Sequence, residues 1–207
     1  MMQLAEVPEA AAVFYPVLKP LKPDYETIEG VKIYMSPSPG WEHATVDSGL
    51  VAIFRNYCIR NGVGKVFGDN MDIHLPDEKN VLKPDLSVFK DRSLFKHGKN
   101  IYGVPDLVAE ILSPSTANRD FGIKKDIYEK NGVKEYWIVN HKDKSIHVYH
   151  LIDGKYKLDH IYHDFSADEL ETLEDDERAE IRKEIKVSVF DDLLVEVADI
   201  FYGLDEV

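Results

Sequence analysis

Apolar residues recur at three- and four-residue spacing in two parts of the chain, and each part predicts an amphipathic helix. The first part extends from Glu42 to Asn61 and stops at Gly62, and the second extends from Arg119 to Asn131 and stops at Gly132. A glycine directly after the last periodic residue is typical of a helix end. The apolar stripe of the first helix consists of Val46, Leu50, Ile53, Phe54 and Tyr57.

Shorter runs that alternate or are wholly apolar predict strands. The β-favouring runs on either side of Glu29-Gly30 predict a hairpin over Tyr25–Met35, and the apolar run Asp106–Leu112 predicts a buried strand. Further strands are predicted at Lys65–Phe67, Met71–Leu75, Asp85–Phe89, Glu135–Asn140, Ser145–Leu151 and Lys155–Tyr162. The order of helix, several strands, helix and strand predicts an α/β (α+β) fold with a central mixed β-sheet flanked by helices.

The 207 residues fit one domain of ordinary size. Four prolines before residue 24 predict an irregular N-terminal arm over 1–24, which leaves 25–207 as a single domain. An acidic helical segment is expected at about 166–184. The segments Lys186–Phe190 and Leu193–Phe201 close the fold, and the apolar residues of the second could form an interface or complete the core.

The formal net charge of −13 disfavours a general electrostatic attraction to DNA, because such binding depends on Lys and Arg that neutralise phosphates. Part of this charge is local, since Asp168–Glu184 holds nine acids against three bases. The one cysteine, Cys58, excludes an internal disulfide and is expected in the core. No apolar run reaches the roughly 18 residues of a membrane span, and residues 1–12 lack a signal-peptide pattern, so we expect a soluble cytoplasmic protein.

Two carboxylates lie at the start of, or within, predicted apolar strands. Asp85 opens one strand, and Glu110 lies within another, where it shares a face with Val108 and Leu112. A carboxylate in an apolar strand is costly unless it is paired or holds a metal. Two carboxylates with water and carbonyl ligands suit Mg²⁺ or Mn²⁺, whereas a turn hydrogen bond for Asp85 and a lysine partner for Glu110 would equally account for the pattern.

The second helix carries a lysine on its apolar side. At about 100° per residue, Lys124 falls between Ile127 and Tyr128 when Ile123 is placed on the apolar stripe. Lys125 falls off the stripe, and Asp120 lies one turn before Lys124. A lysine in this position needs an acidic partner on the adjoining sheet, or else it extends along its own stem to water.

Several longer motifs resemble the Uma-type family of restriction-endonuclease-like proteins, which belongs to the PD-(D/E)XK nuclease superfamily. The central matches are PDLSVF and the run PDLVAEILSPSTANRDFGIKKDIYEKNGVKEYWIVN. YETIEGVKIYMSPSPGWEH is similar to the usual opening of the family, and KVSVFDDLLVEVADIF to its usual ending. The resemblance therefore covers Tyr25 to Phe201.

The resemblance implies a restriction-endonuclease-like core and hydrolysis of phosphodiesters with a divalent metal. Asp85 matches the aspartate of the superfamily motif, and Glu110 matches the acidic residue of the next strand, so both would bind Mg²⁺ or Mn²⁺. The superfamily lysine is expected two residues later, but Leu112 stands there. The family supplies this lysine from the following helix, where Lys124 matches. Glu26 matches a common acidic position, with an exposed edge-strand glutamate as the other interpretation.

Other polar residues have ordinary explanations. His43 precedes the stripe of the first helix and is expected as a core or helix-start residue, and Ser113, Ser115 and Thr116 are expected in turn and capping roles. No glycine-rich phosphate loop is present. Nucleases of this class often act as dimers on a two-fold DNA duplex. The resemblance therefore implies DNA and a second copy of the chain as partners.

Two classes of function follow. The first is a metal-dependent endonuclease in which Asp85, Glu110 and Lys124 are catalytic, with Glu26 as an additional ligand. The second is a non-catalytic binding or assembly protein on the same scaffold, because a fold does not determine a function. RNA or a small phosphodiester is a third possible substrate, and the sequence does not separate it from DNA.

Overall fold

The computed structural model describes residues 24–35, 39–69, 71–91, 94 and 100–204. The predicted irregular arm lies outside these residues except for its last position. Within the described part of the chain, no helix has the length and apolar composition needed to cross a bilayer.

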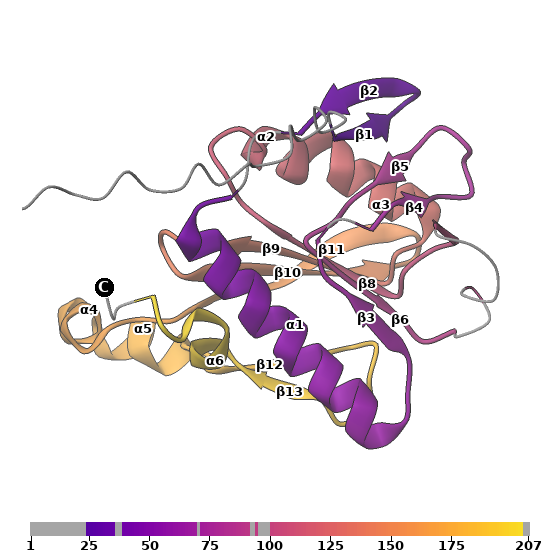
Figure 1. Ribbon diagram of the computed structural model, residues 1–207. Coiled ribbons are helices and arrows are strands. Elements are labelled where there is room, and N and C mark those ends of the chain that lie inside the picture. Colours follow the sequence, from indigo (N-terminus) through magenta and orange to yellow (C-terminus); the bar gives the residue numbers. More distant parts are fainter. Residues whose placement is uncertain (1–23, 36–38, 70, 92–93, 95–99, 205–207) are drawn as a thin grey trace, which may run out of the picture.

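A six-stranded mixed sheet forms the centre of the fold (Figure 1), with the strand order β11-β10-β9-β8-β6-β3. Its neighbouring strands are antiparallel except for β8 and β9, which are parallel. The predicted mixed sheet flanked by helices is therefore confirmed. Its strands are β3 (Lys65–Phe67), β6 (Leu86–Phe89), β8 (Leu107–Ile111), β9 (Glu135–Asn140), β10 (Ser145–Ile152) and β11 (Lys155–His163).

A second sheet has the order β2-β1-β5-β4-β7 and holds the N-terminal hairpin against the body of the protein. Thr27 of β1 pairs with Val81 of β5, which joins the hairpin to the strands that lead to Asp85. The hairpin prediction is confirmed, with Glu29 and Gly30 at the turn in positive-φ conformations. The strands are β1 (Tyr25–Ile28), β2 (Val31–Tyr34), β4 (Ile73–His74), β5 (Val81–Leu82) and β7 (Ile101–Tyr102).

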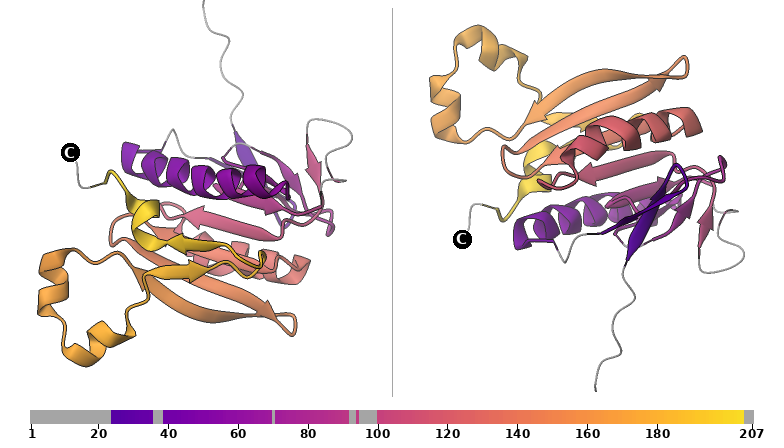
Figure 2. Two further views of the ribbon diagram at one scale, coloured as in Figure 1. Left: turned by 90° about the horizontal axis from the view of Figure 1, so that it is seen from below. Right: turned by 90° about the horizontal axis from the view of Figure 1, so that it is seen from above.

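Both predicted helices are present. The first, α1 (Trp41–Asn61), ends at Gly62 in the left-handed conformation. The second consists of α2 (Ala117–Arg119), a π-helical turn η2 (Asp120–Lys124) and α3 (Lys125–Asn131), and it ends at Gly132. These helices cover opposite faces of the sheet (Figure 2).

Alternation along β8 divides the core into two parts. Leu107, Ala109 and Ile111 pack on the α1 side, whereas Val108 and Leu112 pack on the α3 side. Each face of the strand is buried, as expected for an interior strand of a sheet that helices cover on both sides. Cys58 lies in the core on the α1 side, as predicted.

The C-terminal segment completes the core on the α1 side. It contains β12 (Glu184–Lys186), β13 (Leu194–Glu196) and α6 (Val197–Phe201). The buried carboxylate of Glu135 on β9 accepts hydrogen bonds from the Ser188 N–H at 2.7 Å and from the Ser188 hydroxyl at 2.5 Å. The apolar residues that this segment places in the core are Ile185, Val187, Val189, Phe190, Leu193, Val195, Val197, Ile200 and Phe201.

The acidic segment differs from the prediction of one helical stretch. It forms two short helices, α4 (Ala167–Thr172) and α5 (Asp175–Glu180), which stand out from the body of the protein in Figure 2. The chain is extended at Leu173 and Glu174 between them, and Glu184 already belongs to β12. Each helix begins with a capping box, at Ser166 and at Glu174, and such boxes favour separate helix starts over one continuous helix.

Gly64 connects α1 to β3 at a point where a side chain does not fit. Its φ is +58°, and a Cβ atom would lie 2.7 Å from the carbonyl oxygen of Phe89. We expect Gly64→Ala to lower the free energy of unfolding by about 1–3 kcal/mol, as measured by chemical denaturation. Gly30→Ala is the matched control. Gly30 also has a positive φ of +79°, but no heavy atom of the described residues lies within 4 Å of the position that a Cβ atom would take. Equal losses in the two variants would contradict the steric explanation.

Candidate active site

Asp85 and Glu110 lie side by side on two neighbouring antiparallel strands. Leu86 pairs with Ala109 in the register of β6 and β8, so the residue before Leu86 faces Glu110. Opposite residues of an antiparallel pair point to the same face of the sheet. The Asp85 Oδ2 atom also accepts a 2.6 Å hydrogen bond from the backbone N–H of Ile111. The strand pairing therefore fixes the position of both carboxylates.

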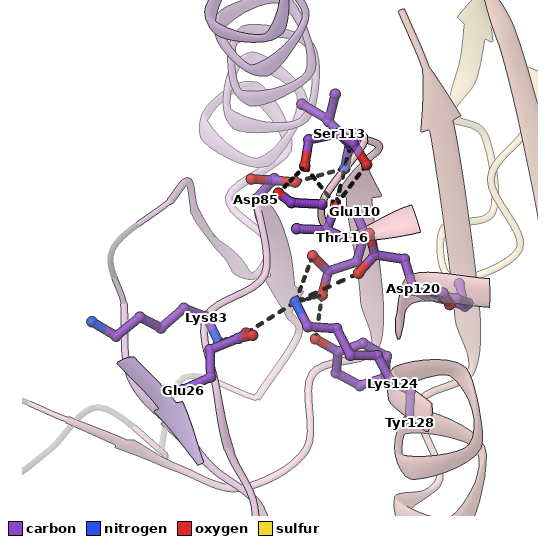
Figure 3. A network of polar contacts seen from close by, with 12 residues as sticks. Glu26, Lys83, Asp85, Glu110, Ser113, Thr116, Asp120, Lys124 and Tyr128 are labelled. Carbon is purple, nitrogen blue, oxygen red and sulfur yellow. Dashed lines mark hydrogen bonds and ion pairs between the residues drawn. The ribbon is translucent and has the colours of Figure 1, made fainter. Parts of the chain in front are cut away.

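The second helix points Lys124 and Tyr128 at Glu110 (Figure 3). The Lys124 Nζ atom lies 3.1 Å from each carboxylate oxygen of Glu110. The Tyr128 hydroxyl donates a 2.7 Å hydrogen bond to Glu110 Oε1. Asp120 lies one turn earlier on the same helix face, with its Oδ1 atom 3.7 Å from Lys124 Nζ. Glu110 is thus fully paired although it is only 3 % exposed.

Glu26 reaches the same cluster from the hairpin strand β1. Its Oε1 atom lies 3.0 Å from Lys124 Nζ and accepts a 2.9 Å hydrogen bond from the backbone N–H of Lys83. Because its exposed fraction is 1 %, the interpretation of Glu26 as an exposed edge-strand residue is wrong. The buried charge cluster, by which we mean Glu26, Glu110, Asp120 and Lys124, draws its members from three separate parts of the chain.

The helix that supplies Lys124 is irregular at this point. Residues 120–124 form a π-helical turn, and Gly122 has non-helical angles of φ −108° and ψ −107°. The Tyr136 hydroxyl donates a 2.9 Å hydrogen bond to the Asp120 carbonyl. Single π-turns of this kind are frequent at functional sites. This turn lies at the cluster that holds the lysine.

The prediction that Lys124 lies on the buried face is confirmed, but its reference residue was wrong. Ile123 is 41 % exposed, whereas Lys124 is 3 % exposed. The buried face includes Asp120, Lys124 and Tyr128 at four-residue spacing, because Lys124 and Tyr128 contact the buried carboxylate of Glu110 and Asp120 lies beside Lys124. Ile127 and Tyr128 of the predicted apolar stripe are buried as well, so only Ile123 lies off the face that packs on the sheet.

Burial and charge set the protonation of the cluster. Burial alone would lower the pKa of Lys124, but the carboxylates of Glu110, Glu26 and Asp120 outweigh it and hold that pKa above its usual range. Burial raises the pKa of Glu110 well above its ordinary value, and Lys124 opposes this rise. The lysine is therefore an ammonium at neutral pH and acts as a hydrogen-bond donor and a positive charge.

His43 lies beside Asp85 and faces the site, although the sequence favoured a core or helix-start role. It is in the first turn of α1, and its Nε2 atom is 3.5 Å from Asp85 Oδ1. Burial works to lower the pKa of His43, but the neighbouring carboxylates of Asp85, Asp47 and Asp69 together raise it. The sequence pattern does not show that His43 contacts Asp85, because the two residues meet only when α1 packs beside the strand that Asp85 precedes.

A cleft with a volume of ≈ 790 Å³ is lined by His43 and by the carboxylates and the lysine of the site. It contains all four residues that the sequence singled out, namely Glu26, Asp85, Glu110 and Lys124. The cleft is also lined by basic residues that were not indicated by the sequence, namely Lys83, Arg119, His141 and Lys142. His141 and Lys142 directly follow β9, so a search for polar residues after strands parallel to β8 would have found them.

Ser113 and Thr116 also line the cleft, and their contacts are those of a turn. The backbone N–H of Ser113 donates to Thr116 Oγ1 at 3.1 Å, and the two hydroxyls lie 3.0 Å apart. Thr116 precedes α2 without a side-chain hydrogen bond to the helix start. The turn role is therefore confirmed, whereas the capping role is not seen for Thr116.

The donor set agrees in kind with a hard divalent cation. Asp85 and Glu110 present carboxylate oxygens to the cleft, which are the ligands that Mg²⁺ and Mn²⁺ prefer. In the described part of the chain, no three acidic, histidine or cysteine side chains converge in a metal-binding arrangement. The Lys124 ammonium lies between the carboxylates of Glu26 and Glu110 instead.

Comparisons with known proteins identify the class. The model of the Uma2 family, described as "Putative restriction endonuclease", matches residues 14–183, which is most of the chain, and the protein belongs to this family. An uncharacterised protein of Synechocystis sp. is 29 % identical over 130 residues, which cover 62 % of this chain and 67 % of that protein.

A solved structure shares the fold. It is the crystal structure of a protein from Anabaena variabilis described as a "putative nuclease belonging to DUF820", with a TM-score of 0.64 at 20 % identity. The similarity covers 86 % of this chain and 90 % of that one. The restriction-endonuclease-like family assignment and the mixed α/β fold are thereby confirmed.

A half-buried aspartate on α1, Asp47, gives a test of the electrostatics of the site. Burial raises the pKa of Asp47 to about 6, and the charges of Asp85 and Asp69 add to this rise. A carboxyl group with a raised pKa in the folded state contributes stability that is present at about pH 4 and is lost as the pH rises through 6. We therefore expect Asp47→Asn to gain stability relative to the parent between pH 4 and pH 8.

The measurement is urea denaturation of both proteins at several pH values across this range. Asp126→Asn, at an exposed carboxylate on α3, serves as the control for the loss of one negative charge. A stability difference between Asp47→Asn and the parent that is the same at pH 4 and pH 8 would contradict the raised pKa.

Proposed function

We propose that this protein is a divalent-metal-dependent endonuclease that hydrolyses phosphodiester bonds of DNA. The observation that carries this proposal is the convergence of Asp85, Glu110 and Lys124 in one cleft, with the lysine delivered by a helix. Membership in the Uma2 family, described as "Putative restriction endonuclease", supports it. Asp85 and Glu110 would hold Mg²⁺ or Mn²⁺, with Glu26 as an additional acidic residue of the site.

A bound divalent ion supplies Lewis acidity and a water molecule of lowered pKa. The residues of the chain would provide the remaining functions. Asp85, which is fixed by the Ile111 N–H, would orient one carboxylate oxygen toward the cleft. Lys124 stays protonated, so it would donate a hydrogen bond to the attacking water or offset charge that develops on the phosphate. It would not act as a general base.

His43 would act on Asp85 from the first turn of α1. Its Nε2 atom contacts Asp85 Oδ1 at 3.5 Å, so it would restrict the orientation of that carboxylate. In this proposal His43 is a positioning residue, because its contact is with Asp85 and not with a reacting atom.

A second candidate is a non-catalytic binding protein on the same scaffold. One observation favours it: Lys124 Nζ already contacts both oxygens of Glu110, and an ammonium and a metal would compete for them. Calorimetric titration with Mg²⁺ and Mn²⁺ separates the two candidates. Binding that Asp85→Ala removes supports the enzyme, and the absence of binding by the folded parent supports the scaffold.

Cleavage assays on plasmid DNA, single-stranded DNA and RNA test the proposed activity. With Mg²⁺ or Mn²⁺, we expect the parent to cut DNA and each of Asp85→Ala, Glu110→Ala and Lys124→Ala to lose at least about a hundredfold in rate. Lys125→Ala is the matched control, because Lys125 lies over the ring of Tyr149 and outside the cleft. We expect it to keep the parental rate.

Circular dichroism of each variant confirms that the loss is not a loss of fold. Metal-independent cutting, or three variants that cut like the parent, would show that the site assignment is wrong. Cleavage of RNA alone would replace DNA as the substrate and keep the site.

A further inference from the structure

Two segments that follow parallel strands meet at the rim of the cleft. β8 leads into the Ser113–Thr116 turn and Arg119, whereas β9 leads directly into His141 and Lys142. Because β8 and β9 are parallel, their C-terminal ends lie at the same edge of the sheet. Both segments line the cleft that contains Asp85 and Glu110. Ligands of open α/β sheets commonly bind outside the carboxyl ends of such strands.

Arg119 is the first cation of the rim. Its buried Nε–H donates no hydrogen bond to any described residue, and the guanidinium forms no ion pair among the residues that the structure describes. A buried donor that is left unpaired carries a cost in free energy. An arrangement of this kind is stable in the free protein only at such a cost, which a bound acceptor would remove.

Lys142 is the second cation of the rim. Its side chain is exposed, and its ammonium has no carboxylate partner within the described part of the chain. The two other lysines of the cleft differ, because both are engaged. Lys124 contacts Glu26 and Glu110, and Lys83 contacts Asp24 and Asp72. The cleft therefore has a paired, acidic interior, and at its rim Arg119 and Lys142 have no carboxylate partner among the described residues, although Glu42 lies 3.9 Å from the neighbouring His141.

We propose that Arg119 and Lys142 bind a phosphate group of a nucleic-acid strand next to the phosphate that is cut. This subsite rests on the proposed function for the identity of its ligand. The planar guanidinium presents paired N–H donors that match two phosphate oxygens, and the lysine adds a point charge. The subsite explains how a chain with a net charge of −13 could hold a polyanion, because attraction at the rim does not need a basic surface.

The subsite predicts a preference for substrates with more than one phosphate. A strand of several nucleotides would reach Arg119 and Lys142 while one phosphodiester lies at Asp85 and Glu110. A small diester such as bis(p-nitrophenyl) phosphate has no second phosphate and would not reach the rim. Loss of the subsite would therefore weaken the action on oligonucleotides and leave the action on the small diester unchanged.

Binding of a fluorescein-labelled 12-nucleotide DNA strand in EDTA tests the subsite without any need for cleavage. We expect Arg119→Gln and Lys142→Gln each to raise the Kd by about tenfold. We also expect each to reduce the slope of log Kd against log salt concentration by about 0.7, the value for one lost contact to a single strand. A purely structural role of either residue would not change this slope.

Matched variants keep the experiment specific. Arg60→Gln removes the same charge at the far end of α1, where Arg60 bonds to the Asn56 carbonyl, and we expect it to bind like the parent. Arg119→Lys keeps the positive charge but removes the paired N–H donors of the guanidinium. We therefore expect weaker binding with an unchanged slope of log Kd against log salt concentration. Arg119→Lys also replaces Arg119→Gln if that variant fails to fold.

The outcomes separate the subsite from the proposed function. Binding that both Gln variants weaken supports the subsite, even if no substrate is cut and the proposed activity fails. Cleavage of DNA by a parent whose Gln variants bind with an unchanged Kd and salt slope overturns the subsite and keeps the activity. A parent that does not bind the oligonucleotide overturns the subsite.

Discussion

The contact between Lys124 and Glu110 is the interaction on which the cleft depends. Glu110 is the fourth of the five residues of β8, where the strand is buried on both faces, and an unpaired carboxylate there would be strongly unfavourable. Lys124 compensates the buried charge of Glu110, and the contact with Glu110 determines which side of the second helix faces the sheet. The π-turn, the hydroxyl of Tyr128 and the approach of the β1 hairpin are all arranged around this one pair.

A lysine that comes from the helix is compatible with Leu112 directly after β8. In the superfamily pattern that the sequence resembles, this position would hold the lysine, but Leu112 packs in the core on the α3 side. The strand is thereby free to end in an apolar residue, and the positive charge enters from a different element. The charges of the site therefore come together only when helix and sheet are packed, whereas a strand that carries both groups would bring them together by itself.

Much of this arrangement is visible in the sequence because it is local. The hairpin, α1, the longer strands and the two faces of β8 follow from periodicity and from turn residues. The two-residue strands β5 and β7 were not predicted, because pairs of residues carry no periodic signal. The burial of Glu26 could not be predicted either, since it depends on the pairing of β1 with a strand more than fifty residues away. Helical periodicity identified Lys124 but misplaced Ile123, because periodicity alone cannot show that a polar stripe faces a buried charge.

The C-terminal hairpin has a consequence for where this protein can be divided. The match of the Uma2 family model ends at residue 183, yet the C-terminal segment from β12 to α6 comes after that point and contributes nine apolar side chains to the core beside α1. Glu135 in the central sheet is moreover bonded to Ser188 of this segment. The part of the chain that the family model matches is thus smaller than the unit that folds. A chain shortened to residues 14–183 would expose to water the apolar residues of the sheet and of α1 that the C-terminal segment covers, and it would be prone to aggregate before any activity could be assessed.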